Sequence, residues 1–417
     1  MAGNTIIEKI IQAHTKSPVR PGEIVWLNLD VRTARDFGGA NVVQNFRQHY
    51  GHAKVDDPKK TFFTFDCVVP AKNIPYASNQ HLCRLWAREQ GIRVFDVDAG
   101  IGSHVAIEQG LAYPGCTFVG TDSHLNLLGA IGAFGQGMGD QDIAFAFKTG
   151  KTWFEVPPTM KVVFKGELKY PCTAKDLTLA VLQNLGASGA LGMAVEFYGQ
   201  AAESLDLAGR ITLASMVTEM GGITGFIPLS EEILDFCRAR AGRPYLEGIY
   251  ADPDAEYCET VEIDLTNLTP LIAAPPRPDN VHQVAELAGK RVDSVFLGSC
   301  TNGRFEDFAA AAEIVQGKKI KPWVMASAVP ATRQVYAQML EKGILKALFE
   351  AGFIISNPGC GGCASGQIGM TGEGEVQIST GNRNFAGKQG AGGTYLASPV
   401  TAAWCALKGE IAVPEAS

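Results

Sequence analysis

Short, mainly apolar runs alternate with longer amphipathic segments along almost the whole chain. Five of the short runs are typical of buried strands: residues 62–65, 94–97, 117–120, 292–297 and 353–355. Five longer segments have helical spacing of their apolar residues: 5–14, 78–90, 174–185, 304–315 and 331–341. Strands that alternate with helices predict an α/β fold.

Two breaks in this pattern indicate domain boundaries. Residues 154–158 precede a new predicted strand at 161–164, and residues 270–278 are the most proline-dense stretch. A chain of 417 residues is also too long for one hydrophobic core. We therefore expect three α/β domains, over residues 1–157, 158–275 and 276–417.

A polar or glycine-rich loop follows each of the five predicted strands. These loops carry Asp66–Cys67, Ser103–His104, residues 121–124, residues 298–304 and residues 357–363. In open parallel sheets, ligands bind beyond the carboxyl ends of the strands. We expect the five loops to converge on one site, with three cysteines on two of them.

Composition and charge exclude several classes of function. With 46% hydrophobic and 19% charged residues the chain has a globular composition, and a net charge of −7 without a basic run argues against nucleic-acid binding. No apolar run approaches the roughly 18–20 residues that cross a bilayer. The first residues lack the apolar core of a signal peptide. We expect a cytoplasmic location and no membrane partner.

The ten cysteines of such a chain are expected as thiols or metal ligands rather than disulfides. Cys360 and Cys363 form a C-x-x-C pair in a glycine-rich loop, and Cys300 lies between a predicted strand and a helix. Glycines there allow the backbone to approach a bulky inorganic centre closely. Six of the remaining seven are interpreted as buried small hydrophobic residues: Cys83, Cys116, Cys172, Cys237, Cys258 and Cys405.

The residues alone leave three interpretations of Cys300, Cys360 and Cys363 open. They could be unrelated loop residues, with the C-x-x-C pair arising by chance or acting as a redox dithiol. A zinc site would need a fourth ligand, and no histidine lies near either motif in the sequence. A [4Fe–4S] cluster on three cysteines would leave one iron open as a Lewis acid.

The pairing of GSCTNGR (298–304) with NPGCGGC (357–363) resembles the aconitase superfamily, closest to the large subunits of 3-isopropylmalate dehydratase and homoaconitase. The resemblance runs almost end to end and includes GTDSH, GKTWFEVP, ITLASM, STGNRNFAGK and YLASPVTAA. It implies a three-domain aconitase-like α/β/α fold around a [4Fe–4S] cluster bound by Cys300, Cys360 and Cys363. It also implies that the swivelling fourth domain, which brings the catalytic serine base, is absent here and belongs to a small partner subunit.

The resemblance assigns further site residues. Asp122, Ser123 and His124 match an active-site D-S-H motif, and Glu196 matches an acidic residue that pairs with that histidine. Asp66 matches the first member of an Asp-His pair. Beyond these, Asn382 matches a cluster-side asparagine and Arg383 matches a substrate-binding arginine.

Several positions around the expected substrate pocket depart from the family pattern. Cys67 stands where the family has the histidine of the Asp-His pair. Ser103 stands where the family has a loop histidine, and His104, one place later, either replaces that histidine or is structural. A thiol is a poorer proton shuttle near neutrality than an imidazole.

Three cationic positions complete the expected pocket. Lys388 replaces a family arginine, so it keeps the charge but loses the bidentate fork for a carboxylate. Arg35 stands where close relatives have a histidine, and Leu125 replaces the threonine after the D-S-H motif. We expect Arg383, Lys388 and Arg35 to bind substrate carboxylates.

The expected reaction is the reversible loss and re-addition of water on a malate- or citrate-like hydroxy acid. His124, oriented by Glu196, is the expected proton donor, Asp122 and Asp66 tune the groups around it, and the base comes from the small subunit. A paralogue acting on a different hydroxy acid and a catalytically inert cluster-binding protein remain alternatives. An iron-responsive RNA-binding protein is disfavoured by the acidic charge and the missing fourth domain.

Overall fold

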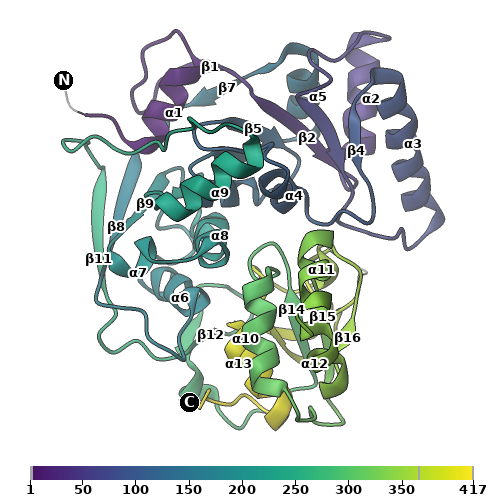
Figure 1. The fold of residues 1–417 in the computed structure, drawn as a ribbon, viewed down its shortest axis with the longest axis vertical. Coiled ribbons are helices and arrows are strands. Elements are labelled where there is room, and N and C mark those ends of the chain that lie inside the picture. Colours follow the sequence, from purple (N-terminus) through teal and green to yellow (C-terminus); the bar gives the residue numbers. More distant parts are fainter. Residues whose placement is uncertain (1–2, 365–366, 416–417) are drawn as a thin grey trace.

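The computed structural model describes residues 3–364 and 367–415, which build three parallel or mixed sheets with helices packed on them (Figure 1). A five-stranded parallel sheet has the order β4-β3-β2-β5-β6. Its strands are β2 (Val31–Arg35), β3 (Thr61–Thr64), β4 (Arg93–Phe95), β5 (Thr117–Gly120) and β6 (Phe134–Gly137). The segments between and after them form α2 (Gly39–Tyr50), α3 (Ile74–Gln90), α4 (Gly102–Glu108), the 3-10 helix η1 (Leu125–Ile131) and α5 (Asp140–Thr149).

Alternation of side chains along the strands gives this sheet two buried faces. Phe63 of β3 packs edge-on against Trp86 of α3 and Phe147 of α5, whereas its neighbour Phe62 packs against Phe118 of β5 on the other face. Burying one such aromatic side chain contributes about 1.5–3 kcal/mol. Helix α1 (Ile6–His14) and the antiparallel pair β1 (Ile24–Asn28) and β7 (Lys151–Glu155) flank the sheet.

The middle of the chain forms a four-stranded parallel sheet in the order β10-β9-β8-β11. Its strands are β8 (Thr159–Lys165), β9 (Ala194–Tyr198), β10 (Thr224–Phe226) and β11 (Glu259–Asp264). Its helices are α6 (Ala174–Leu185), α7 (Gln200–Glu203), α8 (Leu207–Ser215), η2 (Met216–Met220) and α9 (Glu231–Ala241).

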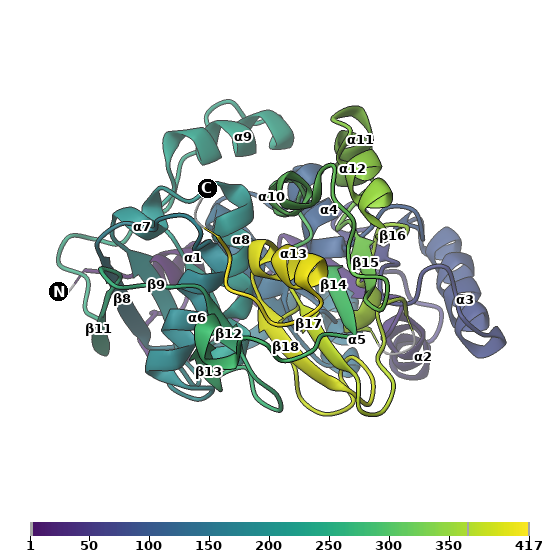
Figure 2. The same cartoon turned by 90° about the horizontal axis from the view of Figure 1, so that it is seen from below.

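The last part forms a seven-stranded mixed sheet in the order β13-β12-β18-β17-β14-β15-β16. Its strands are β12 (Leu271–Ala273), β13 (Val281–Gln283), β14 (Ser294–Gly298), β15 (Met325–Val329), β16 (Ile354–Ile355), β17 (Val376–Ser379) and β18 (Gly393–Ala397). Its helices are η3 (Val284–Leu287), α10 (Phe305–Val315), α11 (Arg333–Glu341), α12 (Ile344–Ala351), η4 (Gly361–Cys363) and α13 (Pro399–Lys408). Figure 2 shows α10 and α13 lying side by side next to this sheet.

The first and the last sheet are wound in the same way. From β2 the chain adds β3 and β4 on one side and then β5 and β6 on the other, and from β14 it adds β15 and β16 and then β17 and β18. Each reversal leaves a crevice at the carboxyl ends of the two central strands, which is where ligands bind in open α/β sheets. The two crevices carry Arg35 and Thr121 in one sheet and Cys300 and Thr380 in the other.

The α/β fold predicted from the sequence is confirmed, and the predicted strand at 117–120 and helix at 174–185 have the observed bounds. The strand predicted at 94–97 is observed earlier, at 93–95, since Asp96 turns back to accept a hydrogen bond from the Val97 amide. Strand β12 pairs with β18 of the last sheet although it precedes residue 276, so the sheet begins before the boundary that the prolines suggested.

One hydrophobic core joins the first and the middle part of the chain. It contains Phe62 and Phe118 of the first sheet together with Val162 and Phe197 of the middle sheet. The cysteines Cys300 and Cys360 of the last part also reach this core. Within the described residues, no helix is long and apolar enough to cross a membrane.

Candidate active site

A cavity of about 620 Å³ lies where the carboxyl-end loops of the first and the last sheet face each other. Four of the five loops predicted to converge line it, and the loop ending in Ser103–His104 does not. The lining residues are Arg35, Phe37, Cys67, Val68, Lys72, Tyr76, Thr121, Asp122, Ser123, His124, Cys300, Cys360, Cys363, Ala364 and Lys388.

The three predicted cluster cysteines all line this cavity. Cys300 follows β14, and Cys360 and Cys363 lie at the two ends of the short helix η4. Gly359 has φ +154° and a Cβ there would lie 3.0 Å from the carbonyl oxygen of Asp66, so glycine is needed for this loop to dock on the first sheet. No cysteine in the described part of the chain is in a disulfide.

The chemistry of these thiols fits an iron–sulfur centre. Burial raises the pKa of Cys300 well above its usual value and also raises that of Cys363, so burial favours the neutral thiol at both positions. Metal binding removes these protons and supplies the missing positive charge. Lys388, Arg35 and Arg383 act in the same direction, because their charges favour the Cys363 thiolate. Three convergent sulfurs beside a cationic wall are suited to a cluster with one open iron.

Arg35 connects the loop of residues 357–363, which carries Cys360 and Cys363, to two carboxylates. Its Nε lies 2.7 Å from Asp66 Oδ1, its Nη1 lies 2.9 Å from Asp122 Oδ1, and its Nη2 lies 2.5 Å from Cys360 Sγ. Burial raises the pKa of Asp66 to about 6, against the opposing charge of Arg35. Burial acts on Asp122 as well, but Arg35 and His124 lower its pKa overall. The guanidinium predicted to bind substrate is thus already engaged by the protein.

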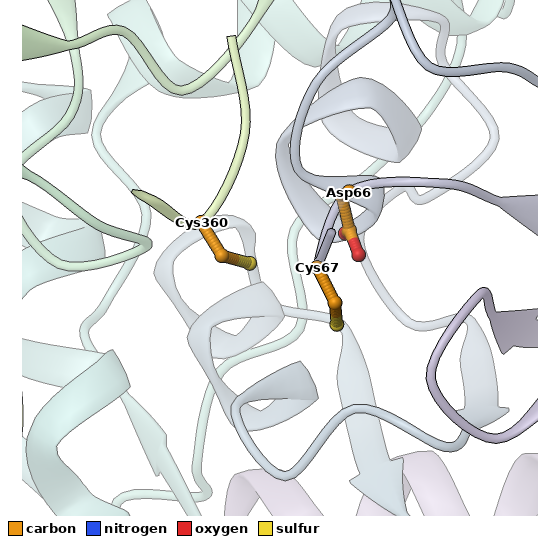
Figure 3. Close-up of side chains that lie close together, drawn as sticks. All are labelled: Asp66, Cys67 and Cys360. Atoms are coloured by element: carbon orange, nitrogen blue, oxygen red, sulfur yellow. The ribbon is translucent and has the colours of Figure 1, made fainter. Parts of the chain in front are cut away.

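Asp36, to which the sequence assigned no role, fixes the loop that carries Asp66 and Cys67. Its Oδ1 accepts hydrogen bonds from the Asp66 and Cys67 amides, at 3.1 and 2.9 Å, and its Oδ2 accepts one from the Val68 amide at 3.1 Å. A second contact joins this loop to the loop of residues 357–363, since the Cys360 amide donates to the Asp66 carbonyl at 2.9 Å. Figure 3 shows Asp66, Cys67 and Cys360 brought close together from these two loops.

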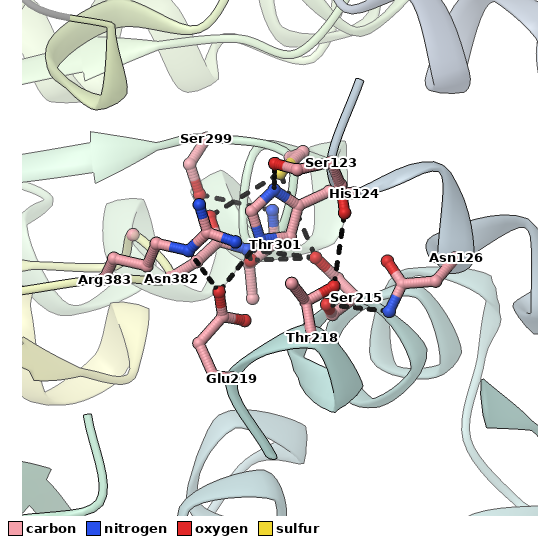
Figure 4. A network of polar contacts seen from close by, with 12 residues as sticks. Ser123, His124, Asn126, Ser215, Thr218, Glu219, Ser299, Thr301, Asn382 and Arg383 are labelled. Atoms are coloured by element: carbon pink, nitrogen blue, oxygen red, sulfur yellow. Dashed lines mark hydrogen bonds and ion pairs between the residues drawn. The ribbon is translucent and has the colours of Figure 1, made fainter. Parts of the chain in front are cut away.

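His124 is paired with Glu219, not with Glu196. Its Nε2 lies 3.0 Å from Glu219 Oε1, and Arg383 Nε donates to the same oxygen at 2.7 Å (Figure 4). Burial alone would raise the pKa of Glu219, but His124 and Arg383 lower it overall. The Nδ1 atom of the imidazole lies 3.3 Å from Ser123 Oγ, so both ring nitrogens have a partner.

The predicted pairing of Glu196 with His124 is therefore wrong. Glu196 lies on β9 and accepts hydrogen bonds from the Ile6 amide at 2.7 Å, Tyr198 Oη at 2.6 Å and Tyr257 Oη at 2.8 Å. These contacts tie the start of α1 to the middle sheet, which is a structural role. Glu219 follows the motif ITLASM by three residues, and an extension of that motif to TEM would have included it.

His104 supports the loop that carries Cys300. It lies on α4, it is fully buried, and its Nε2 lies 2.9 Å from the backbone carbonyl oxygen of Cys300. Burial lowers its pKa to about 3, so the ring is neutral. Of the two interpretations left open by the sequence, this geometry supports the structural one, because the ring of His104 is not part of the cavity wall.

A buried polar network holds Cys300. Cys300 Sγ donates to Asn382 Oδ1 at 3.5 Å, and Asn382 Nδ2 donates to Ser215 Oγ at 3.0 Å and also to Thr301 Oγ1 (Figure 4). Lys175, which the sequence did not single out, donates to the Gly381 carbonyl at 2.6 Å and so fixes the loop before Asn382. Asn382 thus lies beside Cys300, one of the three predicted cluster cysteines, as the resemblance implied.

The two other predicted carboxylate ligands differ in position. Lys388 lines the cavity together with the three predicted cluster cysteines. Arg383 is about a quarter exposed and is held by Glu219 behind His124. The arrangement places a cation at the cavity and a second one next to the predicted proton donor.

Comparison with known proteins agrees with this arrangement. A model of the Aconitase family (aconitate hydratase) matches residues 8–409. The homoaconitase large subunit of Thermus thermophilus is 44% identical over 416 residues, covering 99% of this chain and 98% of that protein. A probable 3-isopropylmalate dehydratase large subunit of Methanothermobacter thermautotrophicus is 42% identical over 414 residues, covering 98% of each chain.

A solved structure shares the fold at low sequence identity. The holo-form of aconitase X from Thermococcus kodakaraensis superimposes with a TM-score of 0.50 at 13% identity, covering 85% of this chain and 83% of that one. The match of the family model over nearly the whole chain, and relatives above 40% identity along it, lead to one conclusion. The chain belongs to the aconitase family.

Proposed function

We propose that this chain is the cluster-bearing large subunit of a hydro-lyase that removes and re-adds water on a malate- or citrate-like hydroxy acid. The convergence of Cys300, Cys360 and Cys363 with His124 in one cavity carries the proposal. The three cysteines would hold a [4Fe–4S] cluster, and the open iron of such a cluster acts as a Lewis acid on a hydroxyl or carboxylate.

His124 is the proton donor in this proposal. Its imidazole lines the cavity, and Glu219 and Ser123 fix the orientation of the ring. A carboxylate on one ring nitrogen fixes the tautomer and the orientation of a histidine that transfers protons. Asp122 holds the backbone of the same residue, because its Oδ1 accepts a hydrogen bond from the His124 amide at 3.0 Å.

Lys388 and Arg383 are the residues proposed to bind the carboxylates of the substrate. Arg35 holds Asp66 and Asp122 in place. The relatives named above are large subunits, which supports a small partner subunit that completes the site. We assign the catalytic base to that partner. The ten unpaired thiols support a location in the reducing cytoplasm.

Cys67 favours a second version of this function, a paralogue with a different hydroxy acid. It lines the cavity at the position of a family histidine. Its thiol is buried beside Cys360, and this contact together with burial raises its pKa well above the usual value. A thiol is smaller than an imidazole and a poorer proton shuttle near neutrality, so the cavity wall here differs in shape from that of the family and does not serve the proton relay.

Anaerobic reconstitution with iron and sulfide tests the cluster. We expect broad visible absorbance that dithionite bleaches, and its loss in Cys300→Ser, Cys360→Ser and Cys363→Ser. The exposed Cys258 provides a matched control, since Cys258→Ser should keep the full spectrum. A colourless protein that binds zinc instead would contradict the proposal.

Turnover is tested after co-expression with a small subunit and a panel of unsaturated dicarboxylates. Hydration of at least one of them is expected, and the Cys67→His variant should shift the preference towards the substrates of the named relatives. Silence of a fully cluster-loaded complex across the panel would favour the inert cluster-binding protein. Ordinary turnover of isopropylmalate by the unmodified complex would exclude the paralogue version.

A further inference from the structure

The cavity contains a fourth cysteine, Cys67, to which the proposed function gives no ligand or proton-transfer role. Cys67 Sγ, Cys360 Sγ and an Asp66 carboxylate oxygen all lie within 4.8 Å of one another, and all three residues are buried. Figure 3 shows that Cys360 extends from its own loop towards the loop of Asp66 and Cys67. Cys67 thus stands next to one of the three proposed cluster ligands.

The two thiols are held together by the backbones that carry them. The Cys360 amide donates to the Asp66 carbonyl at 2.9 Å, and Asn357 Nδ2 donates to the Val69 carbonyl at 2.7 Å. Asp36 fixes the amides of Asp66, Cys67 and Val68 from the other side. Because a disulfide needs sulfurs about 2.05 Å apart, rotation of the side chains has to close the gap while these loops stay in place.

A metal ion is a poor occupant of this group of residues. The guanidinium of Arg35 already contacts two of them, with Nε 2.7 Å from Asp66 Oδ1 and Nη2 2.5 Å from Cys360 Sγ. A cation between the three ligand atoms would be repelled by that charge at close range. The sulfur pair itself is the remaining reactive feature.

We propose that Cys67 and Cys360 form a reversible disulfide when hydrogen peroxide reaches the cluster-free chain. The sulfur of Cys360 attacks one peroxide oxygen, the O–O bond breaks, and a sulfenic acid and one water form. The sulfur of Cys67 then attacks the sulfenic sulfur, the S–O bond breaks, and a second water leaves with the thiol proton. Two electrons pass from the two sulfurs to the peroxide.

This disulfide has a consequence for cluster assembly. While Cys360 is linked to Cys67, one of the three cluster ligands is unavailable, so the cluster cannot be rebuilt. The link also prevents further oxidation of Cys360 to the irreversible sulfinic acid. A dithiol reductant would return both thiols and restore the site. Cys67 therefore acts as a resolving cysteine for an oxygen-sensitive cofactor site.

The test uses the full chain, stripped of iron by a chelator without oxygen and then treated with one equivalent of hydrogen peroxide. Alkylation, digestion and mass spectrometry should give a peptide in which Cys67 is joined to Cys360. The count of free thiols should fall by two from ten and return after dithiothreitol. Cluster reconstitution should fail before the reductant is added and succeed after it.

Variants separate this pair from the C-x-x-C pair. The Cys363→Ser chain should still form the Cys67–Cys360 link. The Cys67→Ser and Cys67→Ala chains, checked for folding by circular dichroism and treated with at least two equivalents of hydrogen peroxide, should instead accumulate sulfinic acid at Cys360 that dithiothreitol does not reverse. A link between Cys360 and Cys363, or recovery of the Cys67 variants by dithiothreitol, would overturn the proposal. Since the readout is made on the cluster-free chain, it stands apart from any failure of the proposed hydro-lyase activity.

Discussion

His124 and Arg383 share a single carboxylate oxygen, Oε1 of Glu219, at 3.0 and 2.7 Å. Glu219 is fully buried and comes from η2, whereas His124 follows β5 of the first sheet and Arg383 follows β17 of the last. One carboxylate thus fixes the proposed proton donor and a proposed substrate cation relative to each other. The three parts of the chain meet at this residue.

The Glu219→Gln variant should lower kcat of the assembled enzyme by about 10²-fold or more, the range that general acid catalysis contributes. The amide keeps the shape of the side chain but removes the charge that orients His124 and Arg383. Steady-state kinetics on the complex with its small subunit measures the effect. The matched control is Glu196→Gln, which should lower the melting temperature while kcat changes less than threefold, an order-of-magnitude bound for a residue outside the site. A larger loss of kcat in Glu196→Gln than in Glu219→Gln would favour the pairing of Glu196 with His124 that was expected from the sequence.

Lys388 and Arg383 should respond differently to substitution. The Lys388→Met variant should raise KM by about tenfold with little change in kcat, since a cation at the cavity wall binds the substrate and the transition state alike. The Arg383→Lys variant should lower kcat, because lysine cannot keep the Nε hydrogen bond to Glu219. Initial rates over a range of substrate concentrations separate the two effects, and a pure kcat defect in Lys388→Met would remove that residue from the binding wall.

Arg304 of the GSCTNGR motif is a structural residue. Its Nη1 lies 2.7 Å from Glu108 Oε1, and Thr332 Oγ1 donates to the same oxygen at 2.8 Å, so α4 of the first part is bound to the last part of the chain. The Glu108→Ala variant should lose about 3–5 kcal/mol of unfolding free energy, because it leaves a buried guanidinium without its counter-charge. Urea denaturation measures the loss. The double variant Glu108→Leu with Arg304→Met should recover part of it, and an unchanged midpoint for Glu108→Ala would contradict the assignment.

His14 and Asp30 should give a pH-dependent contribution to stability away from the cavity. His14 Nε2 lies 2.7 Å from Asp30 Oδ2. Burial alone lowers the pKa of His14, but the hydrogen bonds to Asp30 and to the Ile10 carbonyl raise it overall. Burial alone raises the pKa of Asp30, but the hydrogen bond from His14 lowers it overall.

The directions of these two pKa shifts define the pH range in which the pair stabilises the folded chain. The contribution of His14 is complete below its unfolded pKa of about 6.5 and is lost as pH rises through the folded value. The contribution of Asp30 is present above its unfolded pKa of about 3.9 and is lost as pH falls through the folded value. Between about pH 4 and 6.5, His14→Gln should therefore cost about 0.5–1 kcal/mol after solvent screening. Unfolding curves at pH 5.5 and pH 8.5 measure this, and an equal cost at both values would contradict it.

The sequence by itself determined the alternation of strands and helices and indicated which loops follow the strands. Apolar runs such as residues 117–120 mark buried strands because both faces of a parallel sheet are covered, and the pattern is local. The sequence also drew attention to Cys300 and the C-x-x-C motif, because both follow predicted strands in glycine-rich loops. Their assignment to one cluster came from the resemblance to the aconitase superfamily.

Only the tertiary structure decided which charged groups meet. Glu196 and Glu219 are both acidic residues of the middle part, and nothing local tells which of them reaches His124. The choice depends on the relative placement of β9 and η2 across a shared core, a relationship between residues far apart in the sequence. For the same reason the sequence does not show that His104 contacts the backbone carbonyl of Cys300, or that Cys67 lies beside Cys360. Short sequence motifs indicate which chemistry a side chain can perform, whereas tertiary packing determines which side chains come into contact.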